Sequence, residues 1–305
     1  MLDIQMKFIR ATYIYCEELD YEAPAVIEDS RPASSWPSNG TIEFVDYSMR
    51  YRPELDLVLD NLSFAVRRNE KVGIVGRTGA GKSSITYALM RLVEAEKGLI
   101  KIDGIDISSI GVYDLRSKIT IIPQDPVLFE GTIRDNLDPM NKHTDEEVWD
   151  AINACQIGEL LDKPTEKYVY DPDDDSNGPW IEGVGLQKWI KPGFDTFSVG
   201  QAQLVSLCRA LLWKCKIIVL DEATANVDSK TDKIIQKVIR ERFTECTILT
   251  IAHRLNTIMD SDRILVLDHG QVKEFDTPAN LLANKDSHFT GLVDSMKLSQ
   301  TLLAE

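Results

Sequence analysis

The stretch that most constrains this chain is a glycine-rich loop between a short apolar run and an amphipathic segment. The loop, Gly76–Ser83, has the spacing G-x-x-x-x-G-K-S, and Lys71–Val75 before it predicts a buried strand. After it, apolar residues recur at helical spacing, at Ile85, Ala88, Leu89 and Leu92. A chance glycine turn is the alternative, but it would not need these flanks. A strand, a glycine loop and a helix start together predict a triphosphate-binding loop.

Each part of the loop has a chemical reason. Glycines let the backbone curl so that its N–H groups point at phosphate oxygens. Lys82 can reach the β- and γ-phosphates, and the Ser83 hydroxyl can bind Mg²⁺. The predicted nucleotide-binding residues of this segment are Gly76, Arg77, Thr78, Gly79, Ala80, Gly81, Lys82, Ser83 and Ser84.

Composition narrows the classes of partner. The 305 residues carry a formal net charge of −15, which argues against a nucleic-acid-binding surface. The five cysteines have no C-x-x-C spacing, which favours a reduced, cytosolic setting over disulfides or a metal site. There is no apolar run of transmembrane length and no signal-peptide pattern, so we expect membrane association only through a partner.

The order of predicted elements indicates an α/β fold. Alternation at Thr41–Phe44 and around Leu57–Leu59 predicts strands, and continuous apolar runs predict four more at Ile119–Ile122, Ile217–Leu220, Ile248–Ile251 and Ile264–Leu267. Such runs, separated by helical stretches, are typical of a parallel sheet covered on both faces.

The sequence divides into four segments. Residues 1–20 are predicted to be a helical stub and 21–40 a Pro/Ser-rich extended linker, followed by one domain over 41–296 and a tail over 297–305. Strand-like runs disappear between about Glu130 and Thr196, which predicts a helical insert. Its acidic segment, Asp171–Pro179, is interpreted as a solvated loop, with a Ca²⁺ site as the alternative.

Two carboxylates, Asp221 and Glu222, end the run that begins at Ile217. In an open α/β sheet, ligands bind at the carboxyl ends of the strands. Asp221 is therefore predicted to hold Mg²⁺, and Glu222 to polarise the water that attacks the γ-phosphate.

Three further pieces occur in a fixed order with these two motifs. Phe197–Gln201 opens an amphipathic helix, Gln124 follows the strand at Ile119–Ile122, and His253 follows the strand at Ile248–Ile251. Taken together, these residues resemble an ATP-binding cassette (ABC) nucleotide-binding domain over about Thr41 to Met296.

The resemblance implies a fold and further site residues. The fold is a P-loop NTPase core of RecA type with a mostly parallel sheet, an antiparallel β subdomain and an α-helical subdomain at about 130–205. Tyr51 matches the aromatic residue that stacks on adenine. Ser198, Gly200 and Gln201 match the family's signature sequence, and Gln124 matches its Q-loop glutamine. Asp228 matches the D-loop and His253 the switch histidine.

The sequences of two segments are similar to those of one subfamily, the multidrug-resistance-associated (ABCC) transporters. These are Val72–Ser84 and Leu128–Arg134, and Glu222 stands where the second nucleotide-binding domain of such transporters keeps its glutamate. The resemblance implies MgATP hydrolysis with Glu222, His253 and Gln124 as catalytic residues and Ser83, Gln124 and Asp221 as metal ligands.

The same resemblance implies partners. These are transmembrane domains and a first nucleotide-binding domain, forming a head-to-tail nucleotide-sandwich dimer at the cytosolic face of a vacuolar or plasma membrane. Organic anions or conjugates would be exported. Alternatives are a nucleotide-sensing regulatory domain, an inactive detached fragment, and an ABC ATPase of DNA repair or translation, against which the acidic charge counts.

Two departures from the family pattern bear on coupling to a membrane domain. Ala202 stands where an arginine usually follows the signature, and Pro192–Phe194 replaces the usual Glu-Gly-Gly. We expect the loss of that guanidinium to weaken the packing of the signature helix.

Overall fold

The computed structural model describes residues 22–161, 165–168, 179–183, 185–190, 197–223, 227–251 and 258–302. The predicted helical stub at 1–20, the acidic segment except for Pro179, Pro192–Phe194 and His253 lie outside these ranges. Among the described residues, no helix is long and apolar enough to cross a membrane.

A six-stranded sheet forms the centre of the domain, in the order β14-β13-β3-β12-β11-β6. Five of its strands are parallel neighbours and only β14 runs antiparallel, on β13. The bounds are β3 Lys71–Val75, β6 Ile119–Ile122, β11 Ile217–Asp221, β12 Thr247–Ile251, β13 Arg263–Asp268 and β14 Gln271–Asp276.

The sheet is buried on both faces, as the continuous apolar runs predicted. Along β11, Ile218 and Leu220 face one hydrophobic cluster, whereas Ile217 and Val219 face another. The first cluster is shared with the helical part of the chain and the second with the β-rich part. A third, smaller cluster joins Val75 of β3 and Ile264 and Val266 of β13 to the C-terminal helices. The P-loop NTPase fold expected from the resemblance is confirmed.

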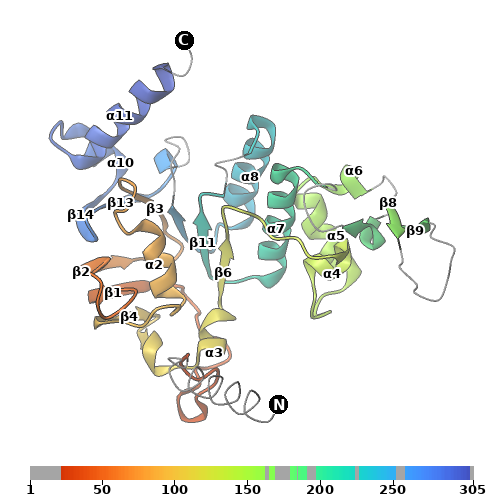
Figure 1. Cartoon of the computed structure of the whole chain (residues 1–305), viewed down its shortest axis with the longest axis horizontal. Helices are drawn as coiled ribbons and strands as arrows, with labels where there is room; N and C mark the ends of the chain where they lie inside the picture. Colours follow the sequence, from red (N-terminus) through yellow and green to blue (C-terminus); the bar gives the residue numbers. More distant parts are fainter. Residues whose placement is uncertain are drawn as a thin grey trace, which may run out of the picture.

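A second, antiparallel sheet has the order β2-β1-β4-β5 and packs against the central one through the second cluster. Figure 1 shows this sheet and the helix α2 on one side, the central strands in the middle and the helices α4 to α7 on the other side. The bounds are β1 Ile42–Met49, β2 Leu59–Val66, β4 Lys97–Ile102, β5 Ile105–Asp106 and α2 Lys82–Leu89.

The remaining helices have the bounds α3 Val112–Arg116, α4 Ile133–Leu137, α5 Asp145–Ala154, α6 Gly158–Leu161, α7 Val199–Trp213, α8 Ser229–Arg242, α10 Pro278–Ala283 and α11 His288–Leu302, with 3-10 turns at Glu28–Ser30, Ile107–Ser109 and Gly185–Gln187. Thr132, Thr144 and Ser198 each begin a helix with a reciprocal capping box.

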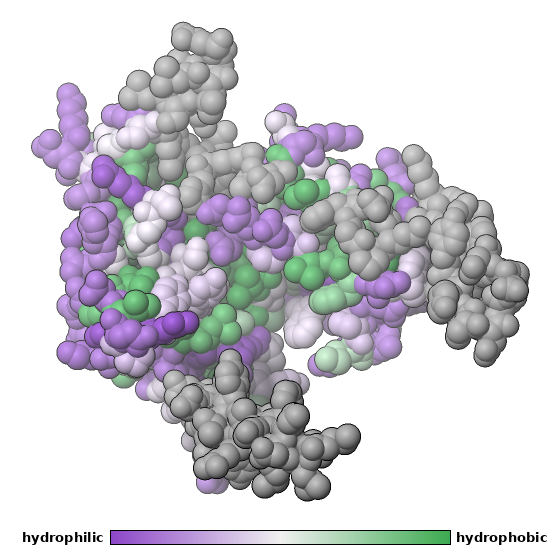
Figure 2. Space-filling model, viewed as in Figure 1, coloured by the Kyte–Doolittle hydropathy of each residue, from purple (hydrophilic) through white to green (hydrophobic). Residues whose placement is uncertain are grey.

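Among the coloured residues in Figure 2, hydrophobic residues form several patches between hydrophilic ones.

Two expectations were wrong in detail. The helix after the glycine loop ends at Leu89, because Arg91 takes a left-handed backbone (φ 49°), and Leu92 is exposed. The insert does contain strands: β7 Gly131–Thr132 pairs with β10 Trp189–Ile190, and β8 Thr165–Tyr168 pairs with β9 Pro179–Gly183. Strands this short leave almost no periodicity to detect.

The residues predicted as a linker pack against the domain where the structure describes them. The Val112 and Tyr113 amides donate to the carbonyls of Pro24 and Ala25 at 3.1 and 2.9 Å. Arg31 pairs with Asp114 at 2.9 Å. This segment, residues 22–37, is called the N-terminal strap below.

Candidate nucleotide site

The glycine loop is held open by its backbone conformation. Gly79 and Gly81 have φ of 81° and 97°, a left-handed region that glycine enters freely. A Cβ on Gly81 would lie 2.9 Å from Leu59 Cδ2 and 3.0 Å from the Val58 carbonyl, whereas one on Gly79 would meet nothing within 4 Å. The open side at Gly79 is therefore where a phosphate group has room to approach the backbone.

Lys82 is the buried charge of the loop. Its side chain is only 7% exposed, and its ammonium donates to the carbonyls of Gly76 and Arg77 at 3.0 and 3.2 Å. Burial lowers the pKa of Lys82, while the charges of Glu222 and Asp221 oppose that change. In the folded chain, the negative charges of Asp221 and Glu222 therefore act directly on the Lys82 ammonium.

The strand register explains how the carboxylates reach the loop. Asp221 is paired with Ile251 of β12, and Ile251 is paired with Ile74 of β3, directly before the glycine loop. Parallel strands end at the same edge of a sheet, so residues far apart in the sequence meet there. Glu222 takes a left-handed backbone (φ 48°), and its amide donates to the Ile251 carbonyl at 2.9 Å.

Gln124 reaches the same edge from the other side of β11. Ile122 and Leu220 are register partners, so Gln124 and Glu222 each stand two residues beyond a matched pair. Gln124 is exposed, Ser83 is exposed at the start of α2, and Asp221 is half-buried. A hydroxyl, an amide oxygen and one carboxylate are suitable oxygen ligands for Mg²⁺, which commonly completes its coordination with substrate phosphates and water.

Tyr51 lies beside α2, the helix that follows the glycine loop. Its hydroxyl is 2.8 Å from Ser84 Oγ, and its ring meets the ring of Tyr87 edge-on with centroids 6.2 Å apart. The Tyr51 side chain is 42% exposed, so a ring face is available for stacking. Of the other residues of the glycine loop, Arg77 and Thr78 are exposed and Ala80 is buried.

The predicted signature residues are placed elsewhere, at the start of α7. Figure 1 shows this helix on the opposite side of β11 and β6 from α2. The Ser198 hydroxyl caps the helix by accepting from the Gln201 amide at 3.2 Å, and the Ser198 amide donates to Gln201 Oε1 at 2.9 Å. These residues belong to a second surface of the domain.

Gly200 of that surface packs on the start of α8. A Cβ there would lie 3.3 Å from Asp228 Oδ2 and 3.2 Å from Thr231 Cγ2. Asp228 caps α8 by accepting from the Lys230 and Thr231 amides at 3.0 and 3.1 Å. Hydrogen bonds from Thr231, above all from its side chain, hold the pKa of Asp228 below its usual range.

Ala202 is completely buried in the core beneath the signature residues. Sequence reasoning missed three polar residues near this core: Asn136, Gln203 and Arg209. All three contact the segment that carries Gln124. For two of them the signal was a polar residue among the apolar residues of α7, Gln203 beside Leu204 and Arg209 beside Ala210.

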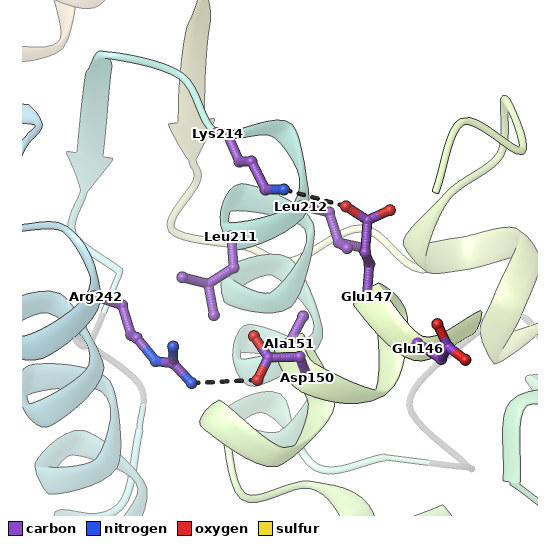
Figure 3. Close-up of a pocket in the computed structure, with 8 residues that line it drawn as sticks. All are labelled: Glu146, Glu147, Asp150, Ala151, Leu211, Leu212, Lys214 and Arg242. Atoms are coloured by element: carbon purple, nitrogen blue, oxygen red, sulfur yellow. Dashed lines mark hydrogen bonds and ion pairs between the residues drawn. The ribbon is translucent and has the colours of Figure 1, made fainter. Parts of the chain in front are cut away.

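A cavity of about 460 Å³ lies at the opposite end of α7 (Figure 3). Two ion pairs border it, Lys214 with Glu147 at 3.2 Å and Arg242 with Asp150 at 3.5 Å. Because it lines the last turn of α7 and not the first, it is separate from both the glycine loop and the signature residues.

Comparison with known proteins decides the family. The family described as "ABC transporter" matches residues 59–225, more than half of the chain. The chain belongs to the ABC transporter family. As a member it is an ATP-binding domain, and the matched range includes the glycine loop Gly76–Ser83.

Relatives of this ABC domain support the narrower resemblance to the ABCC subfamily. It is 51% identical to ABC transporter C family member 13 of Oryza sativa subsp. japonica, over 93% of the chain and 18% of that protein. It is 53% identical to the metal resistance protein YCF1 of Saccharomyces cerevisiae, over 90% and 17%. It is 54% identical to human ATP-binding cassette sub-family C member 3, over 86% and 16%.

The chain therefore spans less than a fifth of the length of these curated relatives. A solved structure, a bacterial Atm1-family ABC exporter with ATP bound, is similar with a TM-score of 0.79 and 28% identity. The similarity covers 96% of this chain and 47% of that one.

Proposed function

We propose that this ABC domain hydrolyses MgATP and powers an exporter of the ABCC subfamily, as its second nucleotide-binding domain. The observation that carries the proposal is the shared sheet edge. There the glycine loop, the buried Lys82 and the pair Asp221–Glu222 lie within one electrostatic environment.

Each side chain at this edge has a distinct task. Lys82 would exchange its bonds to the Gly76 and Arg77 carbonyls for phosphate oxygens. Tyr51 would stack on the adenine, and Glu222 would accept a proton from the water that attacks the γ-phosphorus. His253 is proposed to assist at the same edge, following β12.

The oxygen ligands proposed for Mg²⁺ are Ser83, Asp221 and Gln124. When bound, the ion neutralises charge on the β- and γ-phosphate oxygens. In this arrangement Asp221 supplies the negative charge for the ion, which leaves Glu222 available as the base.

The last part of the proposal concerns the signature residues at the start of α7. Ser198, Gly200 and Gln201 stand apart from the glycine loop, which fits a head-to-tail dimer in which they cover nucleotide on the partner domain. The partner would be the first nucleotide-binding domain, joined to transmembrane domains at the cytosolic face of a membrane. Organic anions or conjugates are the proposed cargo.

The base assignment is tested by Glu222→Gln. Removing the carboxylate should leave the affinity for MgATP within about threefold, because Glu222 is not proposed to bind the nucleotide. Turnover should fall by 10²–10⁴-fold, the usual contribution of a general base. Fluorescent-nucleotide titration and phosphate release measure the two quantities.

Glu241→Gln, a change of an exposed glutamate on α8, is the matched control and should alter neither quantity. Turnover unchanged in Glu222→Gln would remove the base assignment. Failure of the unaltered chain to bind MgATP would remove the proposed function as a whole.

A further inference from the structure

The segment that carries Gln124 is held by the signature helix. We name this segment, Pro123–Phe129, the Gln124 loop. Gln203 Nε2 donates to the Pro123 carbonyl at 2.8 Å, and the Arg209 guanidinium donates to the Val127 carbonyl at 2.6 Å. Both side chains come from α7, so one helix holds the loop backbone by hydrogen bonds on both sides of Gln124.

Gln203 makes this contact at a cost in stability. Its side chain is 1% exposed, and within the described part of the chain its Oε1 atom is buried without a hydrogen-bond partner. A buried, unsatisfied amide oxygen is unfavourable, and an apolar side chain of similar size would avoid it. The bond to Pro123 is the contact that a glutamine makes here and an apolar side chain could not.

Arg209 holds the other end through several bonds. Besides Val127, its guanidinium donates to the Asn136 carbonyl at 2.6 Å and to Asn136 Oδ1 at 2.9 Å, and lies 5.7 Å from the centre of the Phe129 ring. Asn136, itself 2% exposed, accepts from the Phe129 amide and donates to the Phe129 carbonyl, both at 2.8 Å. The network fixes the backbone from Val127 to Phe129 against α7.

We propose that Gln203 and Arg209 are positioning residues that make the Gln124 loop and α7 move as one unit. Gln203 stands five residues after Ser198, on the first turns of the same helix. Loss of either contact would therefore leave Gln124 less firmly placed for the proposed reaction. The part of the inference that concerns nucleotide rests on the proposed function, whereas the mechanical link does not.

The link is tested first without nucleotide, by amide hydrogen exchange in Gln203→Leu and Arg209→Met. Exchange of the amides between Gln124 and Phe129 should rise about fivefold in Gln203→Leu, as expected for one lost hydrogen bond, and more in Arg209→Met. The Gln203→Leu chain should remain folded, because the change also removes the unsatisfied oxygen.

Gln236→Leu, the same change on α8, is the matched control and should leave the Gln124 loop unaffected. Unchanged exchange in the loop in both Gln203→Leu and Arg209→Met would overturn the proposal. So would an equal rise in exchange throughout the domain, since that would show general loss of stability.

The second test separates positioning from binding. In Gln203→Leu, kcat for ATP should fall about tenfold while KM and MgATP affinity stay within twofold, because phosphate-loop contacts are intact. Arg209→Lys should retain more activity than Arg209→Met, since it keeps a donor for one carbonyl. A loss expressed only in KM would contradict the proposal.

Failure of the unaltered chain to bind MgATP would count against the proposed function, and the exchange experiment would still decide the link.

Discussion

At the scale of single residues, the site depends on where the backbone can be approached closely. Gly81 is enclosed by Leu59 and the Val58 carbonyl, while Gly79 faces open space with the same left-handed conformation. The loop therefore needs glycine twice for different reasons. At Gly81 a side chain would clash, and at Gly79 a side chain would occupy the open space in which we propose that phosphate binds.

Tyr51 combines a ring and a hydroxyl whose roles can be separated. Tyr51→Phe removes only the 2.8 Å contact with Ser84 and should change ATP affinity by less than about threefold. Tyr51→Leu removes the stacking face and should weaken ATP binding about tenfold, with less effect on triphosphate alone. Titration with ATP and with tripolyphosphate measures the difference, and equal losses for both ligands would show that Tyr51 does not contact the base.

At the scale of elements, continuous apolar runs located four strands of the central sheet to within one residue at each end, whereas the strands expected at Thr41–Phe44 and around Leu57–Leu59 extend to Met49 and Val66. Ile119–Ile122 was predicted with its observed ends, and the strands at Ile217, Ile248 and Ile264 differ by a residue. β14 was not predicted, because Gln271–Asp276 is mostly polar and lies at the edge of the sheet. A strand buried on both faces leaves a clear signal in the sequence, and an edge strand does not.

Asp103 joins the start of β1 to the turn after β4. Its carboxylate accepts from the amides of Ser38, Asn39 and Thr41 at 2.7 to 2.8 Å. Burial alone would raise the pKa of Asp103, but hydrogen bonds from the Asn39 and Thr41 amides and from the Thr41 hydroxyl hold it below the ordinary value of 3.8. Because the folded-state pKa is the lower one, its stabilisation is complete above about pH 5 and is lost as the pH falls through the folded pKa.

Asp103→Asn should therefore reduce the free energy of unfolding at pH 7 by about 1 kcal/mol, and the deficit should shrink below about pH 4. Urea unfolding at pH 7, 5, 4 and 3 measures this. Asp294→Asn, which removes an exposed carboxylate on α11, is the control for net charge. A deficit that stays constant down to pH 3 would exclude the carboxylate charge as its cause.

At the scale of the whole molecule, the N-terminal strap is part of the packed domain. Trp36 is 6% exposed in the second cluster, and its Nε1 donates to the Ile102 carbonyl at 3.0 Å. A Cβ on Gly111 would lie 2.3 Å from the Ala25 carbonyl, which shows how closely the strap approaches α3. Proline and serine content predicted an extended path, which a 3-10 turn at Glu28–Ser30 interrupts, and carried no information on what that path covers.

Trp36→Ala should lower the stability of the domain by about 3–5 kcal/mol, since it empties a buried aromatic site and removes a hydrogen bond. For a domain of this size the melting temperature should fall by roughly 10 °C. Trp213→Ala is the matched control, because Trp213 is 47% exposed, and it should shift the melting temperature by only a few degrees. Equal shifts for the two variants would show that the strap contributes little to stability.

The sequence by itself determined the glycine loop between a strand and a helix, the carboxylates Asp221 and Glu222 at a strand end, and the parallel sheet that carries them. These follow from local rules, because a phosphate loop needs glycines at given spacings and a buried strand needs continuous apolar residues. Only the tertiary structure decided which polar side chains join these parts. Gln203 and Arg209 contact a loop about 80 residues away in the chain. No local pattern encodes that distance, since it depends on how α7 packs beside β6.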